Sequence, residues 1–155
     1  MKTGASFQRG QSKQDYATPR DFRLAVRYRF GCIETDLAAS LENTLARDFI
    51  SQHKNSLVQN WAKMTPGLCF LNPPFDNIAP WAAKCAAEAK LGARILLLTP
   101  ASIGTNWFAE HVWGNALVLA LRPRLCFDGK NPYPKDVMLS CFNLGDPGFE
   151  CWKWI

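Results

Sequence analysis

Four consecutive residues, Asn72-Pro73-Pro74-Phe75, have the types and spacing to do chemistry on an amino group. Proline has a fixed φ and no main-chain N–H, so two in succession give a stiff turn whose carbonyls point outward. The turn offers the amide oxygen of Asn72 and a free carbonyl as hydrogen-bond acceptors, beside the ring of Phe75. Together these groups can hold the exocyclic amine of a nucleobase while the ring stacks on the base.

Such an amine is a poor nucleophile, because its lone pair is delocalised into the ring of the base. Two acceptors on its hydrogens would push the nitrogen toward tetrahedral geometry and free the lone pair for in-line attack on a methyl sulfonium. By chance, a small polar residue followed by two prolines and an aromatic occurs in about 0.5% of chains of this length. The position directly after an apolar segment, residues 68–71, makes chance rarer still. The alternative is a proline-rich turn that only ends a strand.

The elements that must position this turn alternate between strands and helices. Thr18 is predicted as the N-cap of a helix that begins at Pro19 and ends near Phe30, before Gly31. Further helices are predicted over residues 78–91 and 107–113, and residues 41–49 are interpreted as the start of another. Strands are predicted over residues 32–36, 67–71, 94–99, 116–121 and 137–142. This alternation predicts a doubly wound α/β sheet.

In such a sheet the chemistry lies beyond the carboxyl ends of the strands. Three segments are predicted to reach that edge: Asp36 with residues 38–40, residues 72–75, and residues 99–102. The continuous apolar residues 95–98 are typical of a buried parallel strand. The sequence contains no G-x-G-x-x-G and no P-loop, so dinucleotide-binding and kinase-type hypotheses lack their main residues.

Composition favours one soluble domain. The chain has 155 residues, of which 48% are hydrophobic and 20% charged, and this balance excludes wholesale disorder. No apolar stretch approaches the about 20 residues that a bilayer requires, and the N-terminus lacks the apolar run of a signal peptide. We therefore expect a protein of the cell interior with no membrane partner.

No metal site is predicted. The six cysteines show no C-x₂-C spacing, and the two histidines, His53 and His111, lie far apart in the sequence. Most of the cysteines lie in apolar segments, so buried free thiols are expected in place of a disulfide framework.

The positive charge is concentrated at the N-terminus. Residues 1–31 carry seven Lys and Arg against two Asp, whereas the remaining residues carry 11 of each sign. Residues 1–14, rich in Gly, Ser, Gln and Lys, are predicted to form a flexible basic arm before a single domain of residues 15–155. A localised basic excess attracts a phosphate backbone, although a solubilising tail is an equally good interpretation of charge alone.

Five segments occur in one order and spacing, and together they resemble the phage-type DNA adenine-N6 methyltransferases, the Dam family of bacteriophage and prophage genomes. The similarity runs from about residue 15 to the C-terminus. The segments are Asp-Tyr-Ala-Thr-Pro (15–19), Asp-Leu-Ala-Ala-Ser (36–40), Asn-Ser-Leu-Val-Gln-Asn-Trp (55–61), Asn-Pro-Pro-Phe (72–75) and Asn-Pro-Tyr-Pro-Lys-Asp-Val-Met-Leu (131–139).

The resemblance implies a Rossmann-like fold that binds S-adenosylmethionine (AdoMet), with a mostly parallel sheet and a terminal antiparallel strand. Asp36 would face the methionine ammonium group, and Thr18 with Pro19 would lie at the cofactor carboxylate. The small residues Ala38, Ala39 and Ser40 would let the main chain approach the cofactor. They replace the glycine-rich loop of many methyltransferases.

Other cofactor contacts are less well defined by the resemblance. Asn55 is also predicted to contact the cofactor, and because it stands where relatives often have Asp, the contact would come from an amide and not from a carboxylate. No acid for the cofactor ribose is obvious, and Glu42 and Asp48 are the candidates.

For the substrate, the resemblance implies that Asn72 and Phe75 hold and stack a flipped adenine, with the Pro73 carbonyl as second acceptor and Pro74 completing the turn. Four basic residues surround a Gly/Pro-rich loop, residues 122–136, and are interpreted as contacts to double-stranded DNA: Arg122, Arg124, Lys130 and Lys135.

Two alternatives stay open. The same four residues could serve the exocyclic amine of cytosine, and the fold could persist as a nucleic-acid-binding module without catalysis. Methyl transfer of this kind requires no metal and no covalent enzyme intermediate. The sequence does not determine the oligomeric state or the recognition site, and the expected location is the cytoplasm of a bacterial host.

Overall fold

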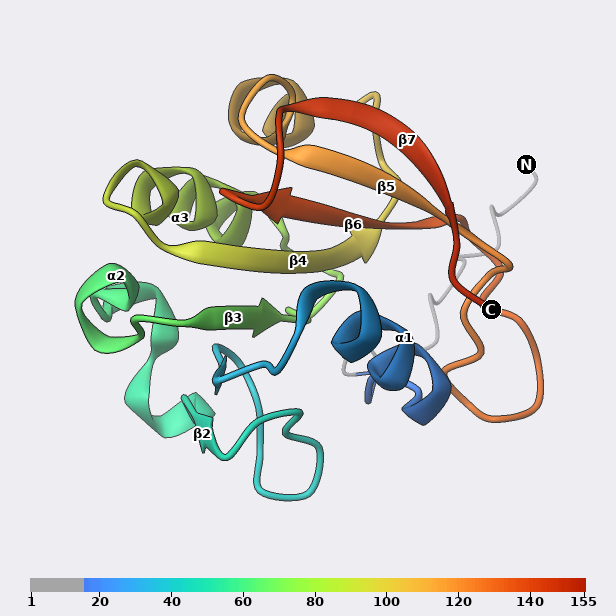
Figure 1. Ribbon diagram of the computed structural model, residues 1–155, viewed down its shortest axis with the longest axis horizontal. Coiled ribbons are helices and arrows are strands. Elements are labelled where there is room, and N and C mark those ends of the chain that lie inside the picture. The colour runs from blue at the N-terminus through green and yellow to red at the C-terminus, as the bar shows by residue number, and fades with distance from the viewer. Residues whose placement is uncertain (1–15) are drawn as a thin grey trace, which may run out of the picture.

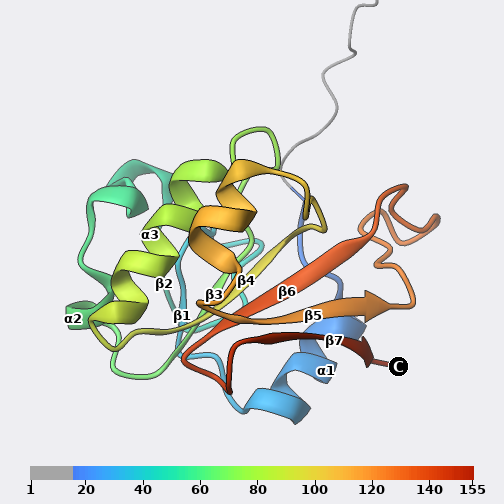
Figure 2. The same cartoon turned by 90° about the horizontal axis from the view of Figure 1, so that it is seen from above.

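The computed structural model describes residues 16–155, which form one seven-stranded sheet with helices on both faces (Figures 1 and 2). The strands lie in the order β2-β1-β3-β4-β6-β5-β7. Their bounds are Thr35–Asp36 (β1), Asp48–Phe49 (β2), Leu68–Leu71 (β3), Arg94–Pro100 (β4), Leu117–Arg122 (β5), Val137–Phe142 (β6) and Gly148–Lys153 (β7). The basic arm predicted over residues 1–14 lies outside the described residues.

The predicted α/β class is confirmed, and the sheet is mostly parallel. β6 is antiparallel to both β4 and β5, whereas the other neighbouring pairs are parallel. This antiparallel strand lies inside the sheet, because β5 and β7 continue beyond it. Residues 95–98 of β4 are fully buried, as their apolar run predicted, and they alternate between two cores.

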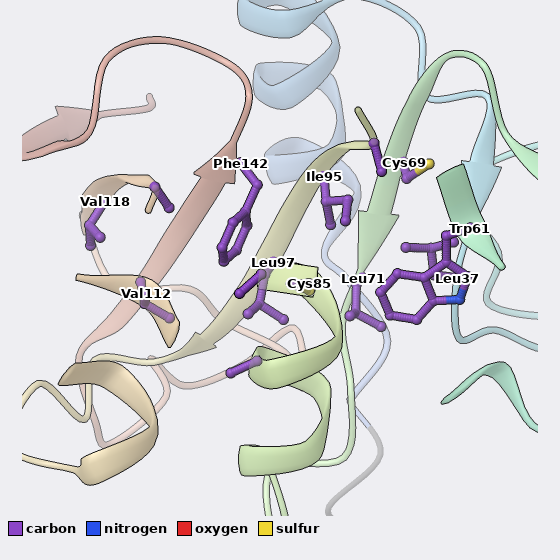
Figure 3. Packing of buried hydrophobic residues seen from close by; sticks show 14 of the residues in the cluster. Leu37, Trp61, Cys69, Leu71, Cys85, Ile95, Leu97, Val112, Val118 and Phe142 are labelled. Atoms are coloured by element: carbon purple, nitrogen blue, oxygen red, sulfur yellow. The ribbon is translucent and has the colours of Figure 1, made fainter. Parts of the chain in front are cut away.

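Each face of the sheet has its own core. On one face, α1 (Arg20–Phe30) buries Phe22 and Val26 against the side chains of Leu96 and Leu98. The other face is covered by α2 (Trp61–Met64), α3 (Ala79–Lys90) and a π-helix at Phe108–Val112. Figure 3 shows this second core, where Trp61 and Cys85 pack over the sheet. No helix of residues 16–155 is long and apolar enough to cross a membrane.

Two local predictions are wrong. Residues 41–49 form a turn and then β2, because the Asn43 side chain accepts from the Ser40 N–H (2.7 Å) and the Thr44 hydroxyl bonds to Ala46. Such local side-chain bonds compete with helix formation. The N-cap of α1 is Pro19, with ψ 142°, and not Thr18, whose hydroxyl bonds elsewhere.

Several other elements differ from the sequence prediction. β7 was not predicted, because its residues are mostly exposed and lack an alternating apolar pattern. The short helix α2 was likewise missed. Residues 32–36 supply only the two residues of β1. Of the cysteines, Cys69, Cys85 and Cys141 are buried as expected, whereas Cys32 and Cys151 are exposed.

Glu88 of α3 joins α3 to α2. This carboxylate is 4% exposed and accepts from the Ala62 N–H (2.8 Å) and from Lys84. We expect Glu88→Ala to lower the free energy of unfolding by about 1–3 kcal/mol, because a buried N–H and an ammonium group lose their acceptor. Urea denaturation measures this loss. Glu88→Gln keeps one acceptor and should lose less, and equal losses in the two variants would contradict this account.

Candidate functional site

The carboxyl ends of β1 and β3 bring the predicted site residues together. The two strands are parallel neighbours, with Asp36 paired to Phe70, so Asp36 and Asn72 emerge at the same edge of the sheet. One small cavity at this edge is lined by Tyr16, Ala17, Thr18, Asp36, Ala38, Asn43 and Asn72. Four residues from distant segments of the sequence, Thr18, Asp36, Ala38 and Asn72, thus share a single site.

The side chain of Asn72 has a defined orientation. Its amide nitrogen lies 2.6 Å from the Tyr16 carbonyl oxygen and 3.2 Å from Thr18 Oγ1. A carbonyl has no hydrogen to donate, so the Asn72 atom facing it must be the NH₂ group. Both N–H bonds of the amide are then used. Within residues 16–155 no group donates to Asn72 Oδ1, and this oxygen is available as an acceptor.

The two prolines of the turn differ in their exposure. Pro73 is buried and Pro74 exposed, and no donor among the described residues bonds to the Pro73 carbonyl. The turn therefore presents two unused acceptors, Asn72 Oδ1 and Pro73 O, within two residues of each other. Asn72 lines the cavity, whereas Pro73 is not part of its lining.

Asp36 is a buried carboxylate that serves both the loop and the cavity. It is 3% exposed, and its two oxygens accept from the N–H groups of Leu45 (3.0 Å) and Ala38 (3.4 Å). Burial raises the pKa of Asp36 to about 6, against the lowering by these two N–H groups and by the charge of Arg23. In the part of the chain that the structure describes, no ion pair neutralises Asp36. The cavity is thus suited to a cationic group.

The Ala38–Ser40 turn already uses its main-chain donors. Ala38 donates to Asp36, Ala39 to the Ile50 carbonyl (3.2 Å) and Ser40 to Asn43 Oδ1 (2.7 Å). The small side chains can therefore make room for a ligand, but these N–H groups cannot bind one without rearrangement. Only Ala38 of the three lines the cavity.

The remaining predicted cofactor residues lie outside this cavity lining. Pro19 precedes α1, and Asn55 is exposed in a left-handed turn with φ 46°. Glu42 is exposed, and the Ser40 hydroxyl lowers the pKa of its carboxyl. Asp48 is exposed on β2. The structure therefore does not single out a ribose-binding acid.

Phe75 belongs to a group of four half-buried rings, the aromatic cluster of Tyr16, Phe75, Phe127 and Tyr133. All six pairs are in contact, with ring centroids between 5.1 and 6.1 Å apart. Phe127 and Tyr133 come from the loop of residues 122–136, so this loop folds against the Asn72–Phe75 turn. The sequence-based prediction gave a role only to the basic residues of this loop. Its two aromatic residues were the feature of the sequence that could have indicated a contact with the Asn72–Phe75 turn.

The four basic loop residues differ in their pairing. Arg124 forms an ion pair with Asp136 at 2.9 Å. Arg122, Lys130 and Lys135 are exposed and make no ion pair with any described residue. The loop is shaped by Asp128, which accepts from the N–H groups of Lys130 and Asn131, and these bonds lower the pKa of Asp128 to about 2.

The buried charge of Asp36 should be visible in the pH dependence of stability. Because the folded pKa lies above the unfolded value of 3.8, this group favours folding below pH 4 and disfavours it as the pH rises through 6. The wild-type protein should therefore lose up to about 3 kcal/mol relative to Asp36→Asn between pH 4 and pH 7.5. Urea denaturation of both proteins at several pH values gives this difference, and a difference independent of pH would contradict the assignment.

The chain is similar to a family of known proteins. Residues 6–132 match the family model of DNA N-6-adenine-methyltransferase (Dam). The chain is 33% identical over 134 residues to a DNA N-6-adenine-methyltransferase of Escherichia phage T1, covering 86% of this chain and 55% of the relative. It is 28% identical over 98 residues to a protein of that name from Haemophilus phage HP1 (strain HP1c1), covering 62% of this chain and 55% of the relative.

The chain thus spans about half the length of the curated relatives that it matches. The family model nevertheless covers the cavity, the Asn72–Phe75 turn and most of the loop at residues 122–136. This chain belongs to the phage-type Dam family of DNA N-6-adenine-methyltransferases.

Proposed function

We propose that this domain transfers a methyl group from AdoMet to N6 of an adenine flipped out of double-stranded DNA, inside a bacterial host cell. The observation that carries the proposal is the fixed amide of Asn72, whose oxygen stays available beside the cavity that contains Asp36. The family and the names of its phage relatives favour adenine over cytosine.

The residues of the cavity fit AdoMet by their chemistry. The Asp36 carboxylate suits the ammonium group of the methionine moiety, because no cation among the described residues pairs with it. Binding of that cation would lower the pKa of Asp36. The affinity for AdoMet should therefore weaken as the pH falls below 6, because Asp36 then becomes protonated and loses its charge. When bound, AdoMet would supply a sulfonium methyl group to the N6 lone pair; the sulfur would leave as the thioether of S-adenosylhomocysteine, and the methylated nitrogen would lose one proton to solvent.

The protein contributes position and hydrogen bonding to the reaction. Asn72 Oδ1 and the Pro73 carbonyl accept the two hydrogens of the adenine amine and favour its tetrahedral form, and Phe75 stacks on the base. Thr18 is a positioning residue, because its hydroxyl helps to orient the Asn72 amide. The step needs no metal and no covalent bond to the enzyme.

The central test is Asn72→Ala. The variant loses an acceptor that acts as the amine becomes tetrahedral, so turnover should fall about 10²–10³-fold. AdoMet affinity, measured by calorimetry, should change little. Nucleoside analysis of the methylated DNA identifies the modified base. A second variant, Phe75→Ala, loses the ring that stacks on the base, so its binding of the flipped base should weaken by about 1–3 kcal/mol. A folded Asn72→Ala protein with the parental rate would refute the mechanism, and methylcytosine in the product would refute the choice of adenine.

The loop at residues 122–136 should contribute to DNA affinity through its unpaired cations. Lys130→Ala removes one exposed charge, so the salt dependence of DNA binding should become shallower by about one unit in the log–log slope. Fluorescence anisotropy at several salt concentrations measures the slope. Lys90→Ala is the matched control, because Lys90 is exposed at the end of α3, before the amino end of β4. Equal slopes for the two variants would show that the loop does not contact DNA.

A further inference from the structure

Among residues 16–155, Tyr16 alone belongs to the aromatic cluster, bonds to Asn72 and lines the cavity. Its ring centroid lies 5.6 Å from that of Phe75, 5.1 Å from Phe127 and 5.4 Å from Tyr133. Its carbonyl oxygen accepts from the Asn72 amide at 2.6 Å, and the residue borders the cavity that contains Asp36. The aromatic cluster, the Asn72 amide and the cavity therefore all have a contact with Tyr16, through either its ring or its main chain.

The packing of the cluster has a consequence for a base that enters the site. In the free protein the ring of Phe75 contacts three other rings, so a flipped base must replace some of these contacts with its own. Phe127 and Tyr133 belong to a loop, whereas Tyr16 precedes α1, which is fixed by the buried side chains of Phe22 and Val26. Tyr16 is thus attached to a helix that has a buried anchor, whereas the other two rings that contact Phe75 are attached to a loop.

Resting on the function proposed above, we infer that Tyr16 is a positioning residue that couples the two binding sites. Its ring forms a wall of the base site, and its main chain forms a wall of the cofactor cavity. Cofactor that contacts residues 16–18 fixes the position of the Tyr16 ring, and this ring then holds the base against Phe75. Because coupling between binding sites is reciprocal, cofactor should raise the affinity for an extruded base, and the base should raise the affinity for cofactor.

The experiment measures this coupling in the 155-residue chain. The probe is a fluorescent duplex with one unpaired adenine, and the cofactor ligand is S-adenosylhomocysteine, which transfers no methyl group. DNA affinity is measured with and without S-adenosylhomocysteine, whose own affinity is measured by calorimetry. For the wild-type protein we expect about fivefold tighter DNA binding with the ligand present.

Variants at position 16 separate the ring from the main chain. Tyr16→Phe keeps the flat ring and should keep the coupling, whereas Tyr16→Ala should bind DNA equally with and without the ligand. Tyr16→Leu keeps apolar volume for folding but lacks a flat face, so it should also lose the coupling. Each variant retains the carbonyl that bonds to Asn72. Tyr28→Ala is the matched control, because Tyr28 is 95% exposed on α1 and should leave the coupling unchanged.

The outcomes distinguish the inference from the proposed function. If the wild-type protein binds S-adenosylhomocysteine but shows no coupling, or if folded Tyr16→Leu retains it, the inference fails and the proposed function stands. A Tyr16→Phe protein that loses the coupling as fully as Tyr16→Leu would also overturn the role of the ring. If the wild-type protein binds no S-adenosylhomocysteine, the proposed function fails together with the inference.

Discussion

The candidate site depends on the two hydrogen bonds donated by the amide nitrogen of Asn72. Without them the amide could rotate and present either its oxygen or its nitrogen to a substrate, and only the oxygen can accept from an amine. A neutral hydrogen bond contributes about 1 kcal/mol, so the pair favours one orientation by roughly tenfold or more. Such a bias decides which chemistry the turn can perform.

The rest of the fold supplies the partners for that amide. β3 ends at Leu71, and the prolines stop the strand, so Asn72 stays at the edge of the sheet. Helix α1 begins directly after Tyr16–Thr18 and is anchored by Phe22 and Val26, both fully buried. Asp36 organises the other side of the cavity through the N–H groups of Leu45 and Ala38, at the cost of holding a buried charge. The site therefore combines a fixed neutral acceptor with a carboxylate that has no ion-pair partner among residues 16–155.

Sequence patterns located the turn and its edge of the sheet, but not the bonds that orient it. The apolar run before Asn72 and the two prolines made this strand end predictable. The acceptor at Tyr16 is a main-chain carbonyl, which every residue type carries, so no pattern marks it. The strand β2 could not be predicted, because the Asn43 side chain accepts a hydrogen bond from the Ser40 N–H and so favours a turn over a helix in residues 41–49. The aromatic cluster unites residues from three distant segments, and their proximity follows only from the fold.

The contact between α1 and β7 bears on the order in which the molecule folds. Figure 2 shows α1 beside β7. Phe22 lies against the rings of Trp152 and Trp154, and Arg29 pairs with Glu150 across 121 positions of sequence. Contacts of such long separation form late, because the loop between them must close first. During synthesis, α1 and the residues before it, Tyr16 and Thr18 among them, leave the ribosome well before β7 exists. A nascent chain would thus hold the Asn72 turn without its final support until β7 is made.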